Sequence, residues 1–218
     1  IILPFKIINA IIKVIYHISL VSPKGVATNA IAGMLDTKAS SVTDMLKKLA
    51  EKDFVSYQKY QGVTLTEKGS HAAKMIVRKH RLWEVFLVEK LNFSWDEVHE
   101  IAEELEHIKS EILINKLDEF LGFPSFDPHG DPIPDEQGII KKIEKHLLSD
   151  AEVNKVYRCI GVKDSSTDFL KYLDKQKIAL GSAIKILERE EFDETLKIAI
   201  DGKNTTISYK IASNLYVQ

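Results

Sequence analysis

The chain contains a single cysteine, Cys159, among its 218 residues, so no intrachain disulfide can form. A zinc site built from several thiolates is excluded for the same reason. Nothing in this cysteine usage indicates an oxidising compartment, and we expect a cytoplasmic protein.

The sequence also lacks the usual signatures of enzymes. It has no glycine-rich phosphate loop and no G-x-S-x-G turn of the serine hydrolases. His99-Glu100 begins like the zinc-protease motif H-E-x-x-H, but position 103 is Glu. Glu104-x-x-His107 resembles half of a di-iron carboxylate site, and no second Glu-x-x-His accompanies it. We therefore do not expect an enzyme.

Long uncharged hydrophobic runs are missing as well. The most apolar stretch, residues 1–21, contains Lys6, Lys13 and His17, which makes it a poor membrane span. It also lacks the small-residue cleavage site of a secretory leader. We expect a buried or dimer-forming helix there, and no membrane partner.

Charge is present in both signs but is unevenly distributed. The net charge of the chain is −2, yet residues 24–81 carry a net charge of +6 and residues 82–136 one of −12. A basic block followed by an acidic block is typical of a polyanion-binding module joined to a cation-binding module. Ordinary variation between solvated surfaces is the alternative explanation.

The periodicity of residues 8–65 predicts a helix-turn-helix followed by a wing. We expect helices over 8–21, over 28–35 with Thr28 as N-cap, and from Ser40, which would cap the next helix. The alternating segments 54–60 and 63–65, joined by a turn at Gln61-Gly62, predict a β-hairpin.

The rest of the chain is predicted to be helical at first and then β-rich. Helices are expected over 66–91, 95–109 and 110–121, followed by a proline-rich segment to about residue 138. Strands are expected over 155–162, 183–190 and 195–200, with a helix over 167–175 and a hairpin turn at Asp201-Gly202. The fold class is therefore mainly α with a small β domain.

Several side chains suited to metal binding share one face of the helix predicted over 95–109. At about 100° per residue, spacings of 4, 7 and 8 residues place four of them within an arc of roughly 100°; these are His99, Glu103, Glu106 and His107. His80 and Glu84 form a further i,i+4 pair on the preceding helix. Carboxylate and imidazole ligands without thiolate suit Mn²⁺ or Fe²⁺. An acidic solvated helix with i,i+4 His–Glu contacts is the alternative.

The helix that begins near Ser40 has the composition of a DNA-reading helix. Hydroxyl groups at its start would contact bases or phosphates, and neighbouring lysines would neutralise phosphates. N-capping is the alternative role for the serines. The candidate DNA-binding residues are Lys38, Ser40, Ser41, Thr43, Lys47, Lys48 and, on the wing, Lys59.

Five segments together resemble the diphtheria-toxin-repressor family of iron- or manganese-dependent transcriptional repressors. The resemblance covers about residues 9–218, and it is carried by S-S-V-T-D-M-L-K-K-L-A-E-K (40–52), Y-Q-G-V-T-L-T-E-K-G (60–69), K-H-R-L-W-E-x-F-L (79–87), W-D-E-V-H-E-x-A-E-x-L-E-H (95–107) and F-D-P-H-G-D-P-I-P (126–134).

The resemblance implies a homodimer in which each chain has three domains. These would be a winged helix-turn-helix over 1–72, a helical dimerisation and metal-binding domain over 73–138, and an SH3-like, FeoA-like barrel over 153–218. It implies a repressor that binds double-stranded operator DNA, senses Mn²⁺ or Fe²⁺ and controls metal-homeostasis genes. The alternative is a metal-independent winged-helix regulator with a degenerate metal site.

The resemblance also implies two metal sites in each chain. His80, Glu84 and His99 match the family's ancillary site, to which Asp168 would add a further ligand. Glu103, Glu106 and His107 match the primary site. Iron-type members carry Cys where this chain has Glu103, and manganese-type members carry Glu, which favours manganese over ferrous iron.

The first predicted helix departs from the family pattern. It usually contributes a Met, an Asp or a similar ligand to the primary site, but Ala10 stands at that position when the chain is aligned on Ile15-Tyr16. Lys13 replaces a second acid seen in manganese-type members. An alignment shifted by one residue would offer Asn9 instead.

Overall fold

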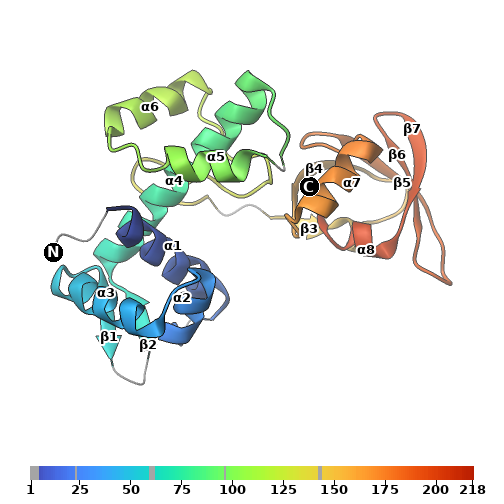
Figure 1. Ribbon diagram of the computed structural model, residues 1–218. Helices are drawn as coiled ribbons and strands as arrows, with labels where there is room; N and C mark the ends of the chain where they lie inside the picture. Colours follow the sequence, from blue (N-terminus) through green and yellow to red (C-terminus); the bar gives the residue numbers. More distant parts are fainter. Residues whose placement is uncertain (1–4, 23, 59–61, 96, 142–143) are drawn as a thin grey trace. The chain divides into compact units, whose positions relative to one another are not determined.

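The computed structural model describes residues 5–22, 24–58, 62–95, 97–141 and 144–218. Over these residues the chain divides into two compact units. The first comprises Ile1–His80, Glu104–Ile112 and Pro134–Ile139, and the second comprises Arg81–Glu103, Leu113–Ile133 and Ile140–Gln218. Figure 1 shows the course of the chain through the elements of each unit.

The first unit contains the predicted winged helix-turn-helix (Figure 1). Its elements are α1 (Phe5–Val21), α2 (Thr28–Met34), α3 (Ala39–Glu51), β1 (Val55–Gln58), β2 (Gly62–Leu65) and the start of α4 (Glu67–Leu91). The strands pair antiparallel, with Val55 opposite Leu65. Isoleucines and leucines spaced three or four residues apart on the helices form the core; Ile11, Ile15, Ile31, Leu46 and Leu49 are at most 1% exposed. Gln61, in the predicted turn, lies outside the described residues.

Both predicted N-caps are wrong. The residue that precedes α2 in extended conformation is Ala27, and the one that precedes α3 is Lys38. Neither cap uses a side-chain hydrogen bond. Ser40 cannot cap α3 because the helix has already begun: Val42 N–H donates to the Lys38 carbonyl at 3.1 Å.

The long helix α4 runs from the basic block into the acidic block, which also contains two shorter helices, α5 (Val98–Leu105) and α6 (Glu111–Phe120). Helix α5 is shorter than the predicted 95–109. Ile108 N–H donates to the Leu105 carbonyl at 3.1 Å, which is a tight turn rather than another α-helical turn. Glu106 and His107 therefore lie just beyond α5, although the sequence predicted them on its face.

The predicted small β domain is part of the second unit. Its sheet has the order β3-β8-β4-β5-β6-β7, and every pairing in it is antiparallel. The elements are β3 (His146–Leu147), η1 (Leu148–Asp150), β4 (Val156–Val162), α7 (Thr167–Gln176), β5 (Ala183–Arg189), β6 (Leu196–Ile200), β7 (Lys203–Ile207), α8 (Tyr209–Ala212) and β8 (Leu215–Val217).

The hairpin turn predicted at Asp201-Gly202 is confirmed. Both residues have positive φ, at 45° and 85°, as a tight two-residue hairpin turn requires. Strands β3, β7 and β8 were not predicted. They are too short or too polar to show an alternating pattern, as in the sequence K-N-T-T-I of β7.

The fold class, mainly α with a small β domain, is thus confirmed. Among the described residues, no helix is both long and apolar enough to cross a membrane.

Candidate metal centre and DNA-facing helix

Three ionisable side chains gather in the second unit around one buried carboxylate. Glu84 on α4 is only 2% exposed. His99 Nδ1 lies 3.3 Å from Glu84 Oε1, and His129 Nδ1 lies 3.8 Å from Glu84 Oε2. Ligand atoms of Glu84, Asp127 and His129 all lie within 4.8 Å of one another. We call Glu84, His99, Asp127 and His129 the Glu84 centre.

Helix α4 adds a further possible ligand. His80 precedes Glu84 by one turn of the same helix, which places both side chains on one face. One ligand atom from each of His80, Glu84 and His99 falls within 4.8 Å of the other two. This grouping corresponds to the set that the family resemblance assigned to the ancillary site.

The loop that carries Asp127 and His129 is folded onto itself by its own polar groups. Asp127 Oδ1 accepts hydrogen bonds from the backbone N–H of His129 at 2.8 Å and of Asp131 at 2.9 Å. An isolated bridge pairs Phe126 with Pro132. These bonds fix the Asp127 carboxylate within its own loop.

A close backbone contact fixes the loop against β4. Gly130 has φ +83°, and a Cβ atom there would lie 2.0 Å from the Ile160 carbonyl oxygen. Val162, two residues after Ile160 on β4, donates its N–H to the His129 carbonyl at 2.8 Å. A side chain at position 130 would push the loop away from the strand.

His129 is oriented as a metal-binding histidine would be. Its Nε2 lies 3.2 Å from the Trp95 carbonyl, which can accept a hydrogen bond only, so this nitrogen carries the proton. Nδ1 then faces Glu84. A histidine ligand usually donates its second ring N–H to a backbone carbonyl or a carboxylate in this way.

Electrostatics couple the ionisation of these groups. Burial on its own would lower the pKa of His129, but the Glu84 carboxylate 3.8 Å away and the charge of Asp127 raise it to about 9. Burial and then the nearby Glu84 charge raise the pKa of Asp127, although Arg81 opposes this. Arg81 Nε lies 3.2 Å from Asp127 Oδ2. When no metal ion is bound, the proton on His129 and the guanidinium of Arg81 therefore offset the negative charge of Glu84 and Asp127.

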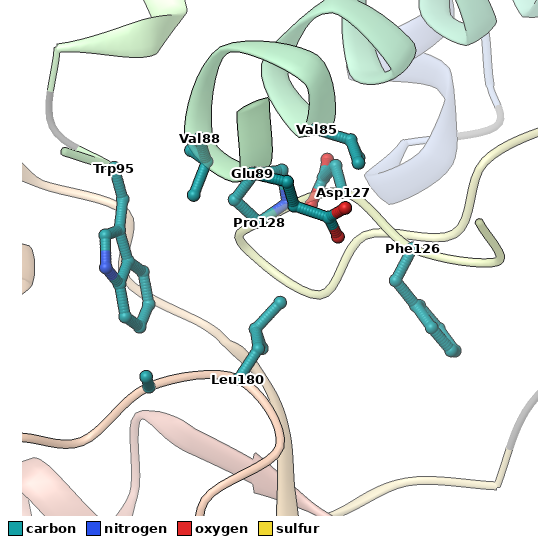
Figure 2. Close-up of a pocket in the computed structure, with 9 residues that line it drawn as sticks. Val85, Val88, Glu89, Trp95, Phe126, Asp127, Pro128 and Leu180 are labelled. Atoms are coloured by element: carbon teal, nitrogen blue, oxygen red, sulfur yellow. The ribbon is translucent and has the colours of Figure 1, made fainter. Parts of the chain in front are cut away.

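An apolar cavity of about 240 Å³ borders the centre at Asp127. Figure 2 shows Val85, Val88 and Glu89 on helix α4 beside Asp127 and Pro128, with Trp95 and Leu180 also on the wall. The cavity wall is mostly hydrocarbon, which keeps the environment of the Asp127 carboxylate poor in water.

The donor set fits a divalent cation. Glu84, Asp127 and His129 bring three ligand atoms within 4.8 Å of one another, and His99 lies beside the other oxygen of Glu84. Carboxylates and imidazoles without sulfur suit Mn²⁺ and Fe²⁺. Cys159 is not available as a ligand, because it is buried in β4 and burial raises the pKa of its thiol to about 11. The helix-face pattern missed Asp127 and His129 because they lie in a loop. The signal that could have indicated them is D-P-H-G-D within the acidic block.

The residues assigned to the primary site are arranged differently. In the first unit, Glu106 Oε2 lies 2.8 Å from Lys13 Nζ and 2.8 Å from His80 Nδ1. Burial would raise the pKa of Glu106, but the hydrogen bond from His80 and the ammonium of Lys13 lower it overall. We call Lys13, His80 and Glu106 the Glu106 cluster.

The remaining predicted ligands are not part of either group. Glu103 on α5 is half exposed, and its Oε2 lies 3.8 Å from His99 Nε2. His107 Nδ1 is buried and has no hydrogen-bond partner among the described residues. Asp168 is exposed in the first turn of α7.

The candidate DNA-binding residues lie on and just before α3. Lys38, Ser40 and Lys47 are exposed, whereas Ser41, Thr43 and Lys48 are half-buried. The Thr43 hydroxyl donates to the Ala39 carbonyl at 2.9 Å, so its own helix already uses that proton. Lys59 lies outside the described residues.

Comparison with known proteins gives three matches to family profiles. Residues 7–63 match the iron dependent repressor N-terminal DNA binding domain, and residues 66–135 match the iron dependent repressor metal binding and dimerisation domain. Residues 146–218 match the FeoA domain.

The chain is also similar to individual proteins and solved structures. The chain is 44% identical over 86 residues to a probable metal transport system membrane protein of Chlamydia trachomatis; the match spans 39% of this chain and 19% of that protein's length. It is 32% identical over 142 residues to the HTH-type transcriptional regulator MntR of Oceanobacillus iheyensis, covering 65% of this chain and 93% of that protein. A solved manganese-dependent transcriptional repressor in complex with manganese is 35% identical, with a TM-score of 0.75, covering 96% and 98% of the two chains.

Proposed function

Since the chain belongs to the diphtheria-toxin-repressor family of iron- and manganese-dependent transcriptional repressors, we propose that it is a metal-responsive DNA-binding repressor. The Glu84 centre carries this proposal, because it places a buried acid and histidine donor set in the same chain as a winged helix-turn-helix. The regulated genes would be those of metal homeostasis.

Glu84, Asp127, His129 and His99 would hold the cation. A bound divalent ion supplies positive charge and joins three segments: α4 through Glu84, α5 through His99 and the loop 126–133 through Asp127 and His129. The proton on His129 Nδ1 must leave before that nitrogen can ligate. In this proposal Mn²⁺ is favoured and Fe²⁺ comes second.

DNA would be bound through α3 and the wing. The exposed Lys38 and Lys47 would contact phosphates, with Lys47 exchanging its ion pair with Asp44 at 3.6 Å for a phosphate, and Ser40 is exposed at the start of the helix. Because lysine–phosphate contacts release counterions, DNA affinity should fall steeply as the salt concentration rises.

A second copy of the chain is the proposed protein partner. Helix α6 and the turn after it expose large apolar side chains that a solvated surface would not favour: Ile112 is 78% exposed, Phe120 65% and Phe123 68%. Burial of such a surface against its own copy gives a twofold dimer that presents two α3 helices to DNA.

The division into domains at 1–72, 73–138 and 153–218 stays a prediction, as does the assignment of Asp168. The proposed repressor acts in the cytoplasm and catalyses no reaction.

The proposal is tested by titrating Mn²⁺ into protein mixed with a fluorescent DNA duplex and following anisotropy. The duplex is selected from a random-sequence library by the protein, once with Mn²⁺ and once with chelator. Mn²⁺ should tighten binding at least tenfold in the wild type, and the variants Glu84→Gln and His129→Ala should lose that response.

Glu104→Gln is the matched control, since it removes an exposed acid from α5 within the same acidic block. It should respond to Mn²⁺ like the wild type. Equal DNA affinity with and without Mn²⁺ would instead favour the metal-independent regulator, and no selectable duplex at all would overturn a DNA-binding role.

A further inference from the structure

The Glu106 cluster contains a cation that belongs to the protein itself. Lys13 Nζ and His80 Nδ1 each lie 2.8 Å from the same atom, Glu106 Oε2. Lys13 lies on α1 and Glu106 lies 93 residues later, so this contact joins two distant segments of the first unit. The ammonium therefore contacts, together with His80, the Glu106 oxygen through which this carboxylate would otherwise bind a metal ion.

Burial makes this contact strong and specific. The side chain of Glu106 is 1% exposed and that of Lys13 is 13% exposed. A buried carboxylate without a partner is costly, so an adjacent ammonium stabilises the charged form. The lowered pKa of Glu106 is consistent with a carboxylate that stays ionised.

A second lysine adds positive charge to the same region. Lys79 Nζ donates to the Ile108 carbonyl at 3.4 Å, two residues beyond Glu106. Burial lowers the pKa of Lys79, and the charges of Glu111 and Glu106 oppose that change. A divalent cation approaching Glu106 would thus meet one ammonium on its ligand atom and another close by.

The two candidate metal groups differ accordingly. In the part of the chain that the structure describes, both sets of three converging ligand atoms contain Glu84, and neither contains Glu103, Glu106 or His107. The residues of the expected primary site therefore do not fit a metal ion as they stand.

We propose that the Lys13 ammonium takes the place of a divalent cation in the Glu106 cluster, so that α1 is linked to the turn after α5 without metal. This inference rests on the proposed function, because it confines the metal response of the repressor to the Glu84 centre. Lys13 acts as a positioning residue: it holds α1, whose Ile11 and Ile15 belong to the winged-helix core.

The test counts Mn²⁺ ions per chain by equilibrium dialysis and metal analysis of the purified full chain. The wild type should bind one ion per chain, and Glu84→Gln should bind none. Lys13→Glu should gain a second ion, since the new carboxylate would join Glu106, His80 and the unpartnered Nδ1 of His107. The double variant with Lys13→Glu and Glu84→Gln should bind one Mn²⁺ ion per chain, at the Glu106 cluster.

Thermal unfolding in the presence of chelator gives a second readout. Lys13→Glu should unfold at a lower temperature than the wild type without metal, because two carboxylates then face each other, and Mn²⁺ should restore the loss. Lys13→Arg should behave like the wild type in both assays. Lys6→Glu is the matched charge reversal, as Lys6 is exposed on the same helix, and it should gain no ion.

Two ions bound to the wild type, with the second lost in Glu106→Gln, would overturn the proposal. The proposal would also be overturned if Lys13→Glu bound the same number of Mn²⁺ ions as the wild type and unfolded at the same temperature in chelator. Neither readout uses DNA, so a failure of the protein to bind a selected duplex would count against the proposed function and leave this inference to be decided by the metal count.

Discussion

Individual ionisable residues have opposite roles in the two groups of acids. In the Glu84 centre Arg81 pairs with Asp127, and the cation beside Glu84 is the imidazolium of His129, which can lose its proton and then offer Nδ1 as a ligand. In the Glu106 cluster the cation is the ammonium of Lys13, whose nitrogen donates hydrogen bonds and has no lone pair to offer a metal ion. The chemistry of one residue thus separates a site that can exchange its cation from one that carries its own.

A pH prediction follows for His129. Its pKa rises from an ordinary value of 6.5 to about 9 in the folded chain, so the proton-linked stabilisation is complete below pH 6.5 and is lost as the pH rises through 9. Metal-free protein should lose up to about 3 kcal/mol of unfolding free energy across that window. Urea unfolding in the presence of chelator at pH 6.5 and at pH 9 measures this loss of unfolding free energy.

His129→Gln should remove most of that dependence, because the side chain no longer binds the proton. Mn²⁺ affinity should change in the opposite direction and rise roughly tenfold per pH unit between pH 7 and 9, since one proton must leave. A flat Mn²⁺ affinity over this range would show that His129 is not a ligand.

At the scale of elements, the position of one loop decides whether the Glu84 centre can form. Asp127 and His129 have no helix or strand of their own, and the close approach of Gly130 to β4 holds them in place. Helix α4 supplies Glu84, and α5 supplies His99. The site therefore depends on a backbone contact between a loop and a strand that contributes no ligand.

Gly130→Ala should disturb this junction. The added Cβ would lie 2.0 Å from the Ile160 carbonyl oxygen at a positive φ, so we expect a loss of about 2 kcal/mol or more and a clear weakening of Mn²⁺ binding. Calorimetric titration with Mn²⁺ and urea unfolding check both effects.

Gly202→Ala is the matched control for backbone strain. Gly202 has φ +85° with no atom within 4 Å of an added Cβ among the described residues, so its cost should be about 1 kcal/mol. Its Mn²⁺ affinity should equal that of the wild type. If both variants weakened Mn²⁺ binding equally, the loop junction would have no special role.

At the scale of the whole molecule, the chain has a basic part, which we propose binds DNA, and an acidic part, which we propose binds metal. The block 24–81 carries +6 and the block 82–136 carries −12. In the proposed mechanism, metal binding would reduce the repulsion within the acidic block, and by linkage DNA and metal should each raise the affinity for the other by the same factor. The exposed apolar surface of α6 is the proposed link between two such chains.

Phe120→Glu should weaken dimerisation and hence DNA binding. A charge on that surface opposes burial against a second copy, and loss of paired α3 helices should lower DNA affinity on the order of 100-fold. Light scattering after gel filtration measures the mass. Phe192→Glu is the control, since Phe192 is 96% exposed on the hairpin between β5 and β6 and should leave the mass unchanged.

Local patterns predicted much of the fold. The isoleucine spacing predicted α1, the alternation around residue 61 predicted β1 and β2, and Asp201-Gly202 predicted its hairpin. These signals depend on neighbours a few residues apart, which is the range over which periodicity is informative. The predicted N-cap residues were wrong and the predicted end of α5 was inexact, because single hydrogen bonds decide where a helix begins and ends.

The sequence by itself determined which chemistry is available: carboxylates and imidazoles in an acidic block, one cysteine and a lysine in the first helix. Only the tertiary structure decided how they combine. Asp127 and His129 join Glu84 because a loop more than 40 residues away in the chain packs against β4, and Lys13 meets Glu106 across 93 residues. Periodicity carries no information over such separations, because long-range contacts are set by the packing of whole elements.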